Sequence, residues 1–408
     1  LFTVLLSCRK PSRMAAKVSP VEAVRYTEGG NGNRQQRKGQ KGLSLRRMAW
    51  ANLGRNRVKT VVTIISLSLA VVLLNLTVTF TNGFDMDKYI SRSMVSDFVV
   101  GDAKYFQTGN IFSADMAVSE DVIGLLQNQG GIENGGRIYG NTSTVREFVT
   151  EEHYRRMHGQ WNDEETLDRM VSQETRDAAG KLMDGAQIYG IERYALEKLM
   201  LLDGDISKLF EPNGRYIAAV YYYDDYGNPR LDSHWAKVGD TIILRYVDEW
   251  KYVENESGEV MMQPVSWRDA EYQVAALVGV PNAMSYRYFG TDAFILNDQT
   301  FIQDTGTNYI MQYSFDTTAE GTAAMEAFLA DLTETKMPQM DYESKLTYAE
   351  EFQSLQSMFL LLGGTLSFII GAVGVLNCFN AILTGILVRR REYAVLQSIG
   401  MTGAQLKQ

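Results

Sequence analysis

The sequence predicts a membrane protein in which α-helical transmembrane spans flank a large α+β extracytoplasmic domain. Two uncharged stretches and the segregation of charge around them predict this class. Residues 8–59 hold 14 Lys or Arg and two acids, residues 85–351 hold 22 basic and 46 acidic side chains, and residues 389–408 hold four basic side chains and one acid. A strongly acidic block is therefore enclosed between two basic blocks.

The two uncharged stretches are long enough to cross a bilayer. Thr60 to Phe84 spans 25 residues and Phe352 to Val388 spans 37. At about 1.5 Å per helical residue the first reaches roughly 37 Å, against a hydrocarbon core of about 30 Å. We assign residues 58–84 to one transmembrane helix and residues 341–388 to a stalk that continues into another. The alternative, two core helices of a soluble domain, is disfavoured because core helices seldom run so long without charge.

The charges at the ends of the two stretches predict their orientation. Basic residues precede the first stretch and follow the second, where Arg389, Arg390 and Arg391 stand together. Acids dominate the other two ends, with Asp85 and Asp87 after the first stretch and Glu350 and Glu351 before the second. Because cytoplasmic flanks carry the excess of Lys and Arg, both termini are predicted in the cytoplasm and the acidic domain outside.

The N-terminal region is predicted to belong to the cytoplasmic side. We interpret residues 1–8 as the end of a truncated transmembrane helix and residues 9–57 as a basic linker with an amphipathic helix over 43–56. This helix would lie on the anionic membrane lipid of the inner leaflet. Its predicted interface anchors are Arg46, Arg47, Trp50, Arg55 and Arg57. Binding of nucleic acid is disfavoured because the basic run adjoins a membrane span.

The acidic block, residues 85–340, is predicted to form the α+β domain. Alternating β-branched and aromatic residues predict strands at 97–100, 137–139, 187–191, 216–223, 241–247, 272–280, 293–296 and 309–315. Apolar residues at helical spacing predict helices at 119–127 and 320–332. Turn residues predict hairpins near 225–229 and 256–258, and the stretch from Asp341 to Met358 is predicted as a helix that continues into the second span.

The sequence offers no constellation for chemistry. His153 and His158 are five residues apart, on different faces of a helix, and His234 stands alone. The two cysteines, Cys8 and Cys378, form neither a disulfide framework nor a zinc site. No nucleophile elbow or phosphate-binding glycine loop is present. We therefore expect no catalytic residues, no cofactor and no metal, so that the chain itself is not an enzyme.

Three motifs carry a resemblance to a known family. Met48 to Arg57, MAWANLGRNR, is followed by Lys59-Thr60 and an apolar helix. Gly374 to Asn380, GVLNCFN, precedes the segment from Val388 to Thr402, VRRREYAVLQSIGMT. These motifs resemble the two helix boundaries of the FtsX-like permeases of ABC transporters. Lys237 to Asp240, KVGD, with the strand after it, is similar to the extracytoplasmic domain of the MacB type.

The resemblance implies an internal fragment of a duplicated two-unit permease, with a MacB-type periplasmic core-like domain and an incomplete FtsX-like domain. It makes residues 389–408 a cytoplasmic segment that couples to an ATPase. The coupling residues it implies are Arg390, Arg391, Glu392, Leu396, Gly400 and Met401. Independently, small residues at intervals of four in the second span, Gly363, Ser367 and Gly371, predict close packing against another helix.

The expected function is that of an ABC transporter permease subunit in the bacterial cell membrane. The resemblance implies a separate ABC ATPase subunit and a second permease copy as partners, and mechanotransmission that exports or releases a lipid, lipoprotein or peptide. An alternative is a membrane sensor or scaffold, for antimicrobial-peptide resistance or for control of a cell-wall hydrolase. An ectoenzyme on a membrane anchor would require a catalytic set that the sequence does not supply.

Overall fold

The computed structural model describes residues 8–9, 11–13, 15–17, 57–83, 85–107, 111–142, 144–224, 228–254, 260–286, 291–388, 390–400 and 402. The chain divides into two compact units, one of residues 1–83 with 357–408 and one of residues 84–356. The second unit holds all the described strands and is an α+β domain, which confirms this part of the predicted class.

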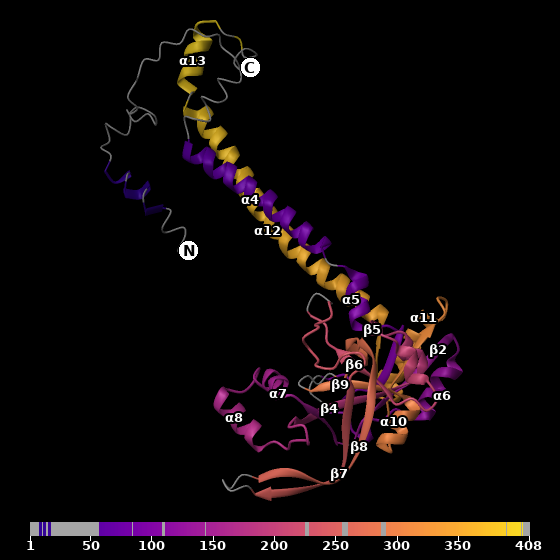
Figure 1. Cartoon of the computed structure of the whole chain (residues 1–408). Coiled ribbons are helices and arrows are strands. Elements are labelled where there is room, and N and C mark those ends of the chain that lie inside the picture. Colours follow the sequence, from indigo (N-terminus) through magenta and orange to yellow (C-terminus); the bar gives the residue numbers. More distant parts are fainter. Residues whose placement is uncertain are drawn as a thin grey trace. The chain divides into compact units, whose positions relative to one another are not determined.

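Eleven strands form one mixed sheet in the second unit (Figure 1). They are β1 (Phe98–Asp102), β2 (Ile132–Gly140), β3 (Thr144–Val149), β4 (Leu182–Ile191), β5 (Met200–Gly204), β6 (Tyr216–Tyr221), β7 (Thr241–Glu254), β8 (Val260–Gly279), β9 (Asp292–Asn297), β10 (Ile310–Thr317) and β11 (Met340–Ser344). Each of the eight predicted strands overlaps one of these elements, and the predicted ranges 97–100, 216–223, 272–280 and 309–315 extend one or two residues beyond the observed strands. The predictions missed β3, β5 and β11.

Six of the strands close into a ring. Their order is β4-β3-β7-β8-β6-β9, and β9 pairs in parallel with β4 to complete the circle. Alternate residues of each strand face one enclosed core, as in Ile217, Ala219 and Tyr221 of β6 or Ile242, Leu244 and Tyr246 of β7. Because strand side chains alternate between faces, this period of two places the apolar row inside and leaves the intervening residues outside.

Strand β4 joins the ring to the rest of the sheet. One edge of β4 pairs with β9 over Ala186–Ile191. The other edge pairs with β3 up to Ala186 and with β2 from Tyr189 onward. The order then continues β2-β10-β1-β11 as an open arm. Strand β4 therefore changes its partner near Gln187, and β2 and β3 separate there.

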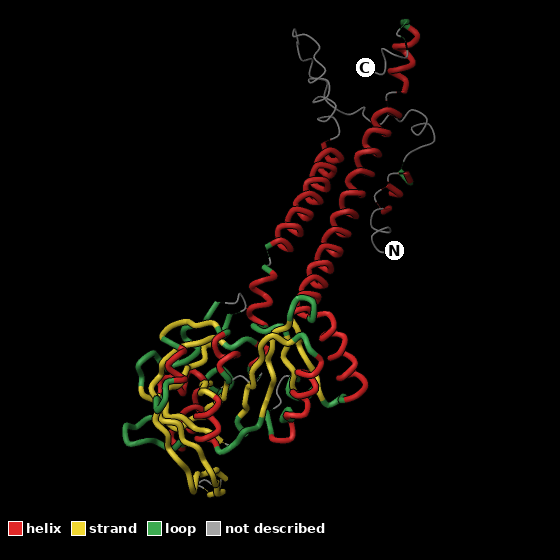
Figure 2. The backbone as a smooth tube through the Cα atoms, turned by 90° about the vertical axis from the view of Figure 1, so that its right-hand side faces the viewer, coloured by secondary structure: helices red, strands yellow, loops and turns green. Residues whose placement is uncertain are grey.

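Helices cover the sheet on different sides (Figures 1 and 2). They are α5 (Met86–Ser93), α6 (Glu120–Gln129), α7 (Glu151–His158), α8 (Glu164–Gln173), α9 (Arg193–Glu197), α10 (Asp298–Thr305) and α11 (Thr322–Asp331). Short turns are η1 (Ala114–Met116), η2 (Ile206–Phe210), η3 (Asn282–Met284) and η4 (Leu332–Lys336). The two predicted helices correspond to α6 and α11, whose apolar stripes join the main core through Ile123, Leu126, Met325 and Leu329.

Beyond the ring, β7 and β8 continue as a two-stranded ribbon. Their antiparallel register extends to Glu254 opposite Val260, so the predicted turn near 256–258 connects paired strands, although its residues lie outside the described ones. The predicted hairpin near 225–229 is bounded by a bridge between Tyr223 and Pro229, and residues 225–227 also lie outside the described part.

The prediction of a helix from Asp341 is wrong over its first residues. Residues 340–344 form β11, which pairs with β1 in the register Phe98 opposite Ser344. The long helix α12 (Lys345–Val388) begins after it, where the Ser344 hydroxyl accepts from the backbone N–H of Thr347 at 3.1 Å. The pairing with β1 satisfies the backbone groups of this polar stretch, and this tertiary partner overrides the local helical pattern.

The first unit contains α4 (Arg57–Asn82), residues 357–388 of α12, and α13 (Arg390–Ser398). Figure 2 shows α4 and α12 side by side. Of the predicted first segment, 1–8, only Cys8 is described, and the predicted amphipathic helix 43–56 lies outside the described residues.

Candidate functional site

The helix pair packs along a seam of small residues. A Cβ atom placed on Gly363 of α12 would overlap the Thr77 side chain of α4, lying 2.8 Å from the Thr77 Cβ. The Thr77 hydroxyl donates to the Leu73 carbonyl at 2.8 Å, which fixes its rotamer. Only glycine therefore permits this approach of the two backbones, as in other closely packed membrane helices.

The same seam continues along both helices. Ser367 is buried, and its hydroxyl donates to the Gly363 carbonyl at 2.7 Å. A Cβ on Gly371 would lie 3.6 Å from the Ala70 Cβ, in ordinary contact. The structure thus brings Gly363 and Gly371 to one neighbour, α4, and Ser367 is buried on the same helix between them. Gly374 also belongs to this seam, because it lies against Leu67 of α4. The predicted spacing of four residues did not include it.

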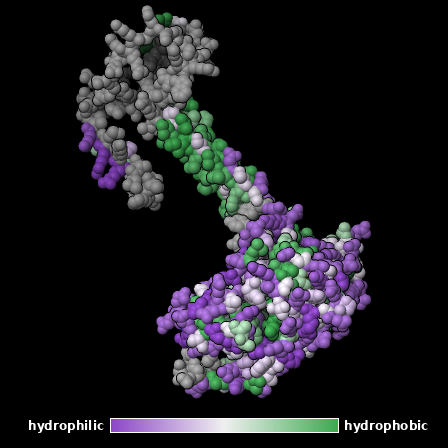
Figure 3. Space-filling view, in the orientation of Figure 1, coloured by the Kyte–Doolittle hydropathy of each residue, from purple (hydrophilic) through white to green (hydrophobic). Residues whose placement is uncertain are grey.

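The outer surface of the helix pair is apolar (Figure 3). Among the described residues, two helices are long and apolar enough to cross a membrane, Thr60–Asn82 and Lys345–Thr384. In each of these two helices, only 11% of the most apolar stretch is buried. Large exposed side chains include Ile65 and Val71 of α4 and Leu361 and Phe368 of α12. Helices buried in the core of a soluble domain do not leave such a surface open.

The predicted coupling segment contains α13. Arg390 begins this helix and is exposed, and the backbone N–H of Gly400 donates to the Gln397 carbonyl at 3.1 Å. Gly400 has a φ of 101°, which favours glycine after a helix C-terminus. Arg391, Glu392 and Leu396 lie within α13, but the structure does not describe their side chains. Met401 lies outside the described residues. Val395 and Ile399 are exposed apolar residues of this segment.

The predicted interface anchors are largely outside the described part of the chain. Arg46, Arg47, Trp50 and Arg55 lie outside it, and Arg57 is described only as the first residue of α4.

A buried group of ionisable side chains lies inside the strand ring, where the sequence suggested nothing. Glu147 of β3 follows Val145 on the inward face, and Asp292 of β9 precedes Phe294 on the same face. The His153 Nε2 atom lies 2.7 Å from the Asp292 Oδ2 atom, and the Trp235 indole donates to Glu147 at 2.7 Å. Glu147 and Asp292 are 1% and 3% exposed.

The protonation of this group follows from its burial. Burial raises the pKa of Glu147 well above its ordinary value, and the negative charge of Asp292 raises it further. Burial by itself would also raise the pKa of Asp292, but that pKa is lowered overall because His234 and His153 favour the carboxylate. The two pKa values are therefore shifted in opposite directions, that of Glu147 upward and that of Asp292 downward. These residues are remote in sequence, so only the ring brings them together.

Among the described residues, no set of three or more His, Cys, Asp or Glu side chains is placed to hold a metal ion. The Arg156 Nη2 atom lies 2.7 Å from the His153 Nδ1 atom, and the His234 Nδ1 atom accepts from the backbone N–H of Ala236 at 3.0 Å. The arrangement is that of an internal polar network that closes one part of the ring core.

Comparisons with protein-family models and with curated proteins find no match. Among solved structures, the chain is similar to the extracellular domain of the noncanonic ABC-type transporter YknZ from Gram-positive bacteria, at 11% identity and a TM-score of 0.29, over 60% of this chain and 100% of that one. It is also similar to the periplasmic region of MacB from Actinobacillus actinomycetemcomitans, at 10% identity and a TM-score of 0.32, over 64% and 94%.

Proposed function

We propose that the chain is part of the transmembrane permease subunit of an ABC transporter. In this proposal α4 and α12 cross the bacterial cell membrane, and the strand-rich unit lies outside. A partner ATPase hydrolyses ATP, and the outer unit moves in response, which exports or releases a lipid, lipoprotein or peptide.

The observation that carries the proposal is the apolar exterior of the α4–α12 pair. In water these side chains would expose a large apolar surface, and each Å² of apolar surface exposed to water costs about 25 cal/mol of free energy. In a bilayer the same side chains face lipid, and the glycine seam supplies the packing that holds the helices together. The charged residues that flank the two helices support the orientation, with the basic flanks in the cytoplasm and the acidic flanks outside.

A mechanical role is supported by the length of α12. It is a single helix of 44 residues that contributes to both compact units. At its outer end, Lys345 forms an ion pair with Asp97 at 3.0 Å and donates its backbone N–H to the Asp97 carbonyl. The helix is thereby tied to β1 and β11, so a displacement of α12 would be transmitted to the sheet.

Docking of the ATPase is proposed for the segment that follows α12. The exposed side chains of Val395 and Ile399 give α13 an apolar contact surface beside the charge of Arg390. No described feature favours the sensor or scaffold alternative over this role.

Labelling of single cysteines tests the topology. With Cys8 and Cys378 replaced by serine, Lys208→Cys in the outer unit and Gln397→Cys in α13 each place a thiol at an exposed position. In intact cells a membrane-impermeant maleimide should label the first and reach the second only after permeabilisation. Labelling of both positions in intact cells would refute the topology.

Co-purification tests the coupling segment. The double variant Arg390→Glu/Arg391→Glu should release the ATPase subunit. The double variant Arg169→Glu/Lys208→Glu, which reverses two charges at exposed positions of the outer unit, should not. Equal recovery of the ATPase with both variants would contradict docking at α13.

A further inference from the structure

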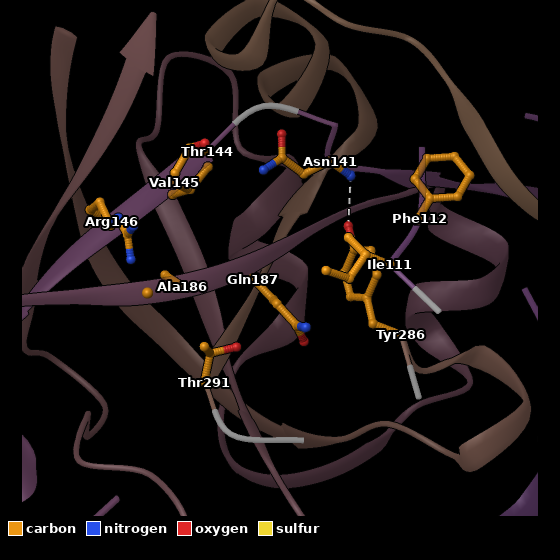
Figure 4. Close-up of a pocket in the computed structure, with 11 residues that line it drawn as sticks. Ile111, Phe112, Asn141, Thr144, Val145, Arg146, Ala186, Gln187, Tyr286 and Thr291 are labelled. Carbon is orange, nitrogen blue, oxygen red and sulfur yellow. Dashed lines mark hydrogen bonds between the residues drawn. The ribbon is translucent and has the colours of Figure 1, made fainter. Parts of the chain in front are cut away.

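A pocket lies on the outer face of the strand ring, where β4 changes its partner from β3 to β2. Its volume is about 230 Å³. Figure 4 shows the side chains that line it. They are Ile111, Phe112, Asn141, Thr144, Val145, Arg146, Gly185, Ala186, Gln187, Tyr286 and Thr291. Because β2 and β3 part at this point, the sheet cannot fill the space with its own paired strands.

Arg146 supplies the charge of the pocket. It lies on β3 opposite Gly185, whose missing side chain leaves room for the guanidinium. The Arg146 Nε atom is buried without a hydrogen-bond partner. Within the described part of the chain its guanidinium makes no hydrogen bond or ion pair, and it lies 5.1 Å from the centre of the Trp250 ring.

The contrast with a neighbouring arginine shows that Arg146 is uncommitted. Arg245 lies opposite Arg146 on β7 and makes two hydrogen bonds to the Asp269 carboxylate, both of 2.8 Å. Arg146 also acts electrostatically on Glu174, the residue that follows α8. Burial raises the pKa of Glu174, Arg146 opposes that rise, and the two form no ion pair.

The rest of the lining suits a ligand with both polar and apolar parts. None of the lining residues is an acid. The Thr291 hydroxyl is buried without a partner, and no described side chain hydrogen-bonds the Gln187 amide. Ile111 and Phe112 supply apolar surface on the side of the pocket away from Arg146 (Figure 4). The buried Nε atom of the half-buried Arg146 and the buried Thr291 hydroxyl both lack partners, which is costly unless a ligand supplies them.

We propose that this pocket binds a carboxylate joined to an amide and a small apolar group. A planar carboxylate matches the two-pronged guanidinium of Arg146, the amide of the ligand pairs with Gln187, and the apolar group lies against Phe112. The volume is below the about 300–1,000 Å³ of pockets that enclose whole drug-sized ligands, so the pocket takes the end of a ligand. The source of this chemistry is the C-terminal residue of a peptide or a free N-acyl amino acid.

Calorimetry on the full chain in detergent tests the ligand class. The probe is N-acetyl-leucine, its neutral control is N-acetyl-leucinamide, and 4-methylpentanoate is the acid without the amide. We expect N-acetyl-leucine to bind about ten- to a hundred-fold more tightly than N-acetyl-leucinamide, because the control lacks the charge-assisted hydrogen bonds. Binding of 4-methylpentanoate should be intermediate. Equal binding of acid and amide, or equal binding of inorganic phosphate, would overturn the proposal.

Variants locate the binding. Arg146→Gln should weaken N-acetyl-leucine about ten-fold or more, and Arg146→Lys should lie between that variant and the unaltered chain, because lysine keeps the charge but loses the fork. Arg169→Gln, at an exposed position of α8, is the matched control and should leave binding unchanged. Circular dichroism verifies folding. Unchanged binding in a folded Arg146→Gln or Arg146→Lys variant would refute the site.

A last comparison separates the two sources. If peptides are the ligand, a tripeptide ending in leucine should bind at least as tightly as N-acetyl-leucine, and its C-terminally amidated form should not bind. If the tripeptide binds more weakly than N-acetyl-leucine, the pocket selects free N-acyl amino acids. Binding in the outer unit does not require that α4 and α12 cross a membrane, so this result is independent of the topology experiment.

Discussion

Replacing Gly363 by alanine should separate α4 from α12, whereas replacing its neighbour Gly364 should not. A Cβ at position 363 would lie 2.8 Å from the Thr77 Cβ, while a Cβ at 364 meets no atom within 4 Å. Carbon atoms in contact lie about 3.5–4.0 Å apart. The helices must therefore move apart by about 1 Å at this point, since Thr77 is held by its bond to the Leu73 carbonyl.

The two variants isolate the clash. Both gain the helix propensity of alanine over glycine, about 1 kcal/mol. Overpacking at position 363 costs about 1–3 kcal/mol, and Gly364→Ala carries no such cost. The packing free energy of the helix pair should therefore differ between the variants by about 1–3 kcal/mol, in favour of Gly364→Ala.

Disulfide formation across the seam measures the separation. A Cβ at Gly371 lies 3.6 Å from the Ala70 Cβ, within the range of about 3.5–4.5 Å for a disulfide. In a background without Cys8 and Cys378, Ala70→Cys/Gly371→Cys should oxidise readily and should continue to do so with Gly364→Ala. Adding Gly363→Ala to the same cysteine pair should sharply slow the formation of the disulfide. Equal oxidation rates for the two alanine variants would show that the glycine seam does not set the distance between the helices.

Two further predictions concern pH. The folded chain holds a proton on Glu147 that the unfolded chain releases above 4.5, so stability should fall as pH rises from there toward the raised pKa. Glu147→Gln should flatten this decline in the melting temperature between about pH 5 and about pH 9, and an unchanged slope would contradict a protonated Glu147. The hydrogen bond to Asp184 raises the pKa of His158 from 6.5, so its stabilisation is complete below 6.5 and is lost as pH rises through the raised pKa. His158→Gln should lower the melting temperature more at about pH 5 than at about pH 9, and an equal loss at both would exclude this linkage.

Much of the domain was predictable because its strands have a local signal. Runs such as Tyr216–Tyr221 and Asp292–Asn297 are rich in the apolar residues that central strands need on both faces. Strand β3 has no such run, since Arg146 and Glu147 interrupt it. Strand β11, with Asp341 and Glu343, is likewise polar and forms through its pairing with β1.

The pocket and the buried ionic group had no signal in the sequence. Arg146 on β3, Gln187 on β4 and Thr291 before β9 meet because β4 exchanges one partner strand for another. Glu147 and Asp292 face each other because β9 closes the ring. Contacts of this kind depend on the order of the strands in the sheet, and the spacing of residues along the sequence does not specify that order.

The sequence alone determined the two apolar helices, the charge blocks at their ends, the α+β character of the acidic block and the small residues of α12. These are properties of short segments, set by hydropathy, charge and local period. Only the tertiary structure decided that Thr77 faces Gly363, that six strands close into a ring, and that one arginine lies unpaired in a pocket. Each of these joins residues far apart in the chain, where pairing and packing choose the partner and local propensity does not.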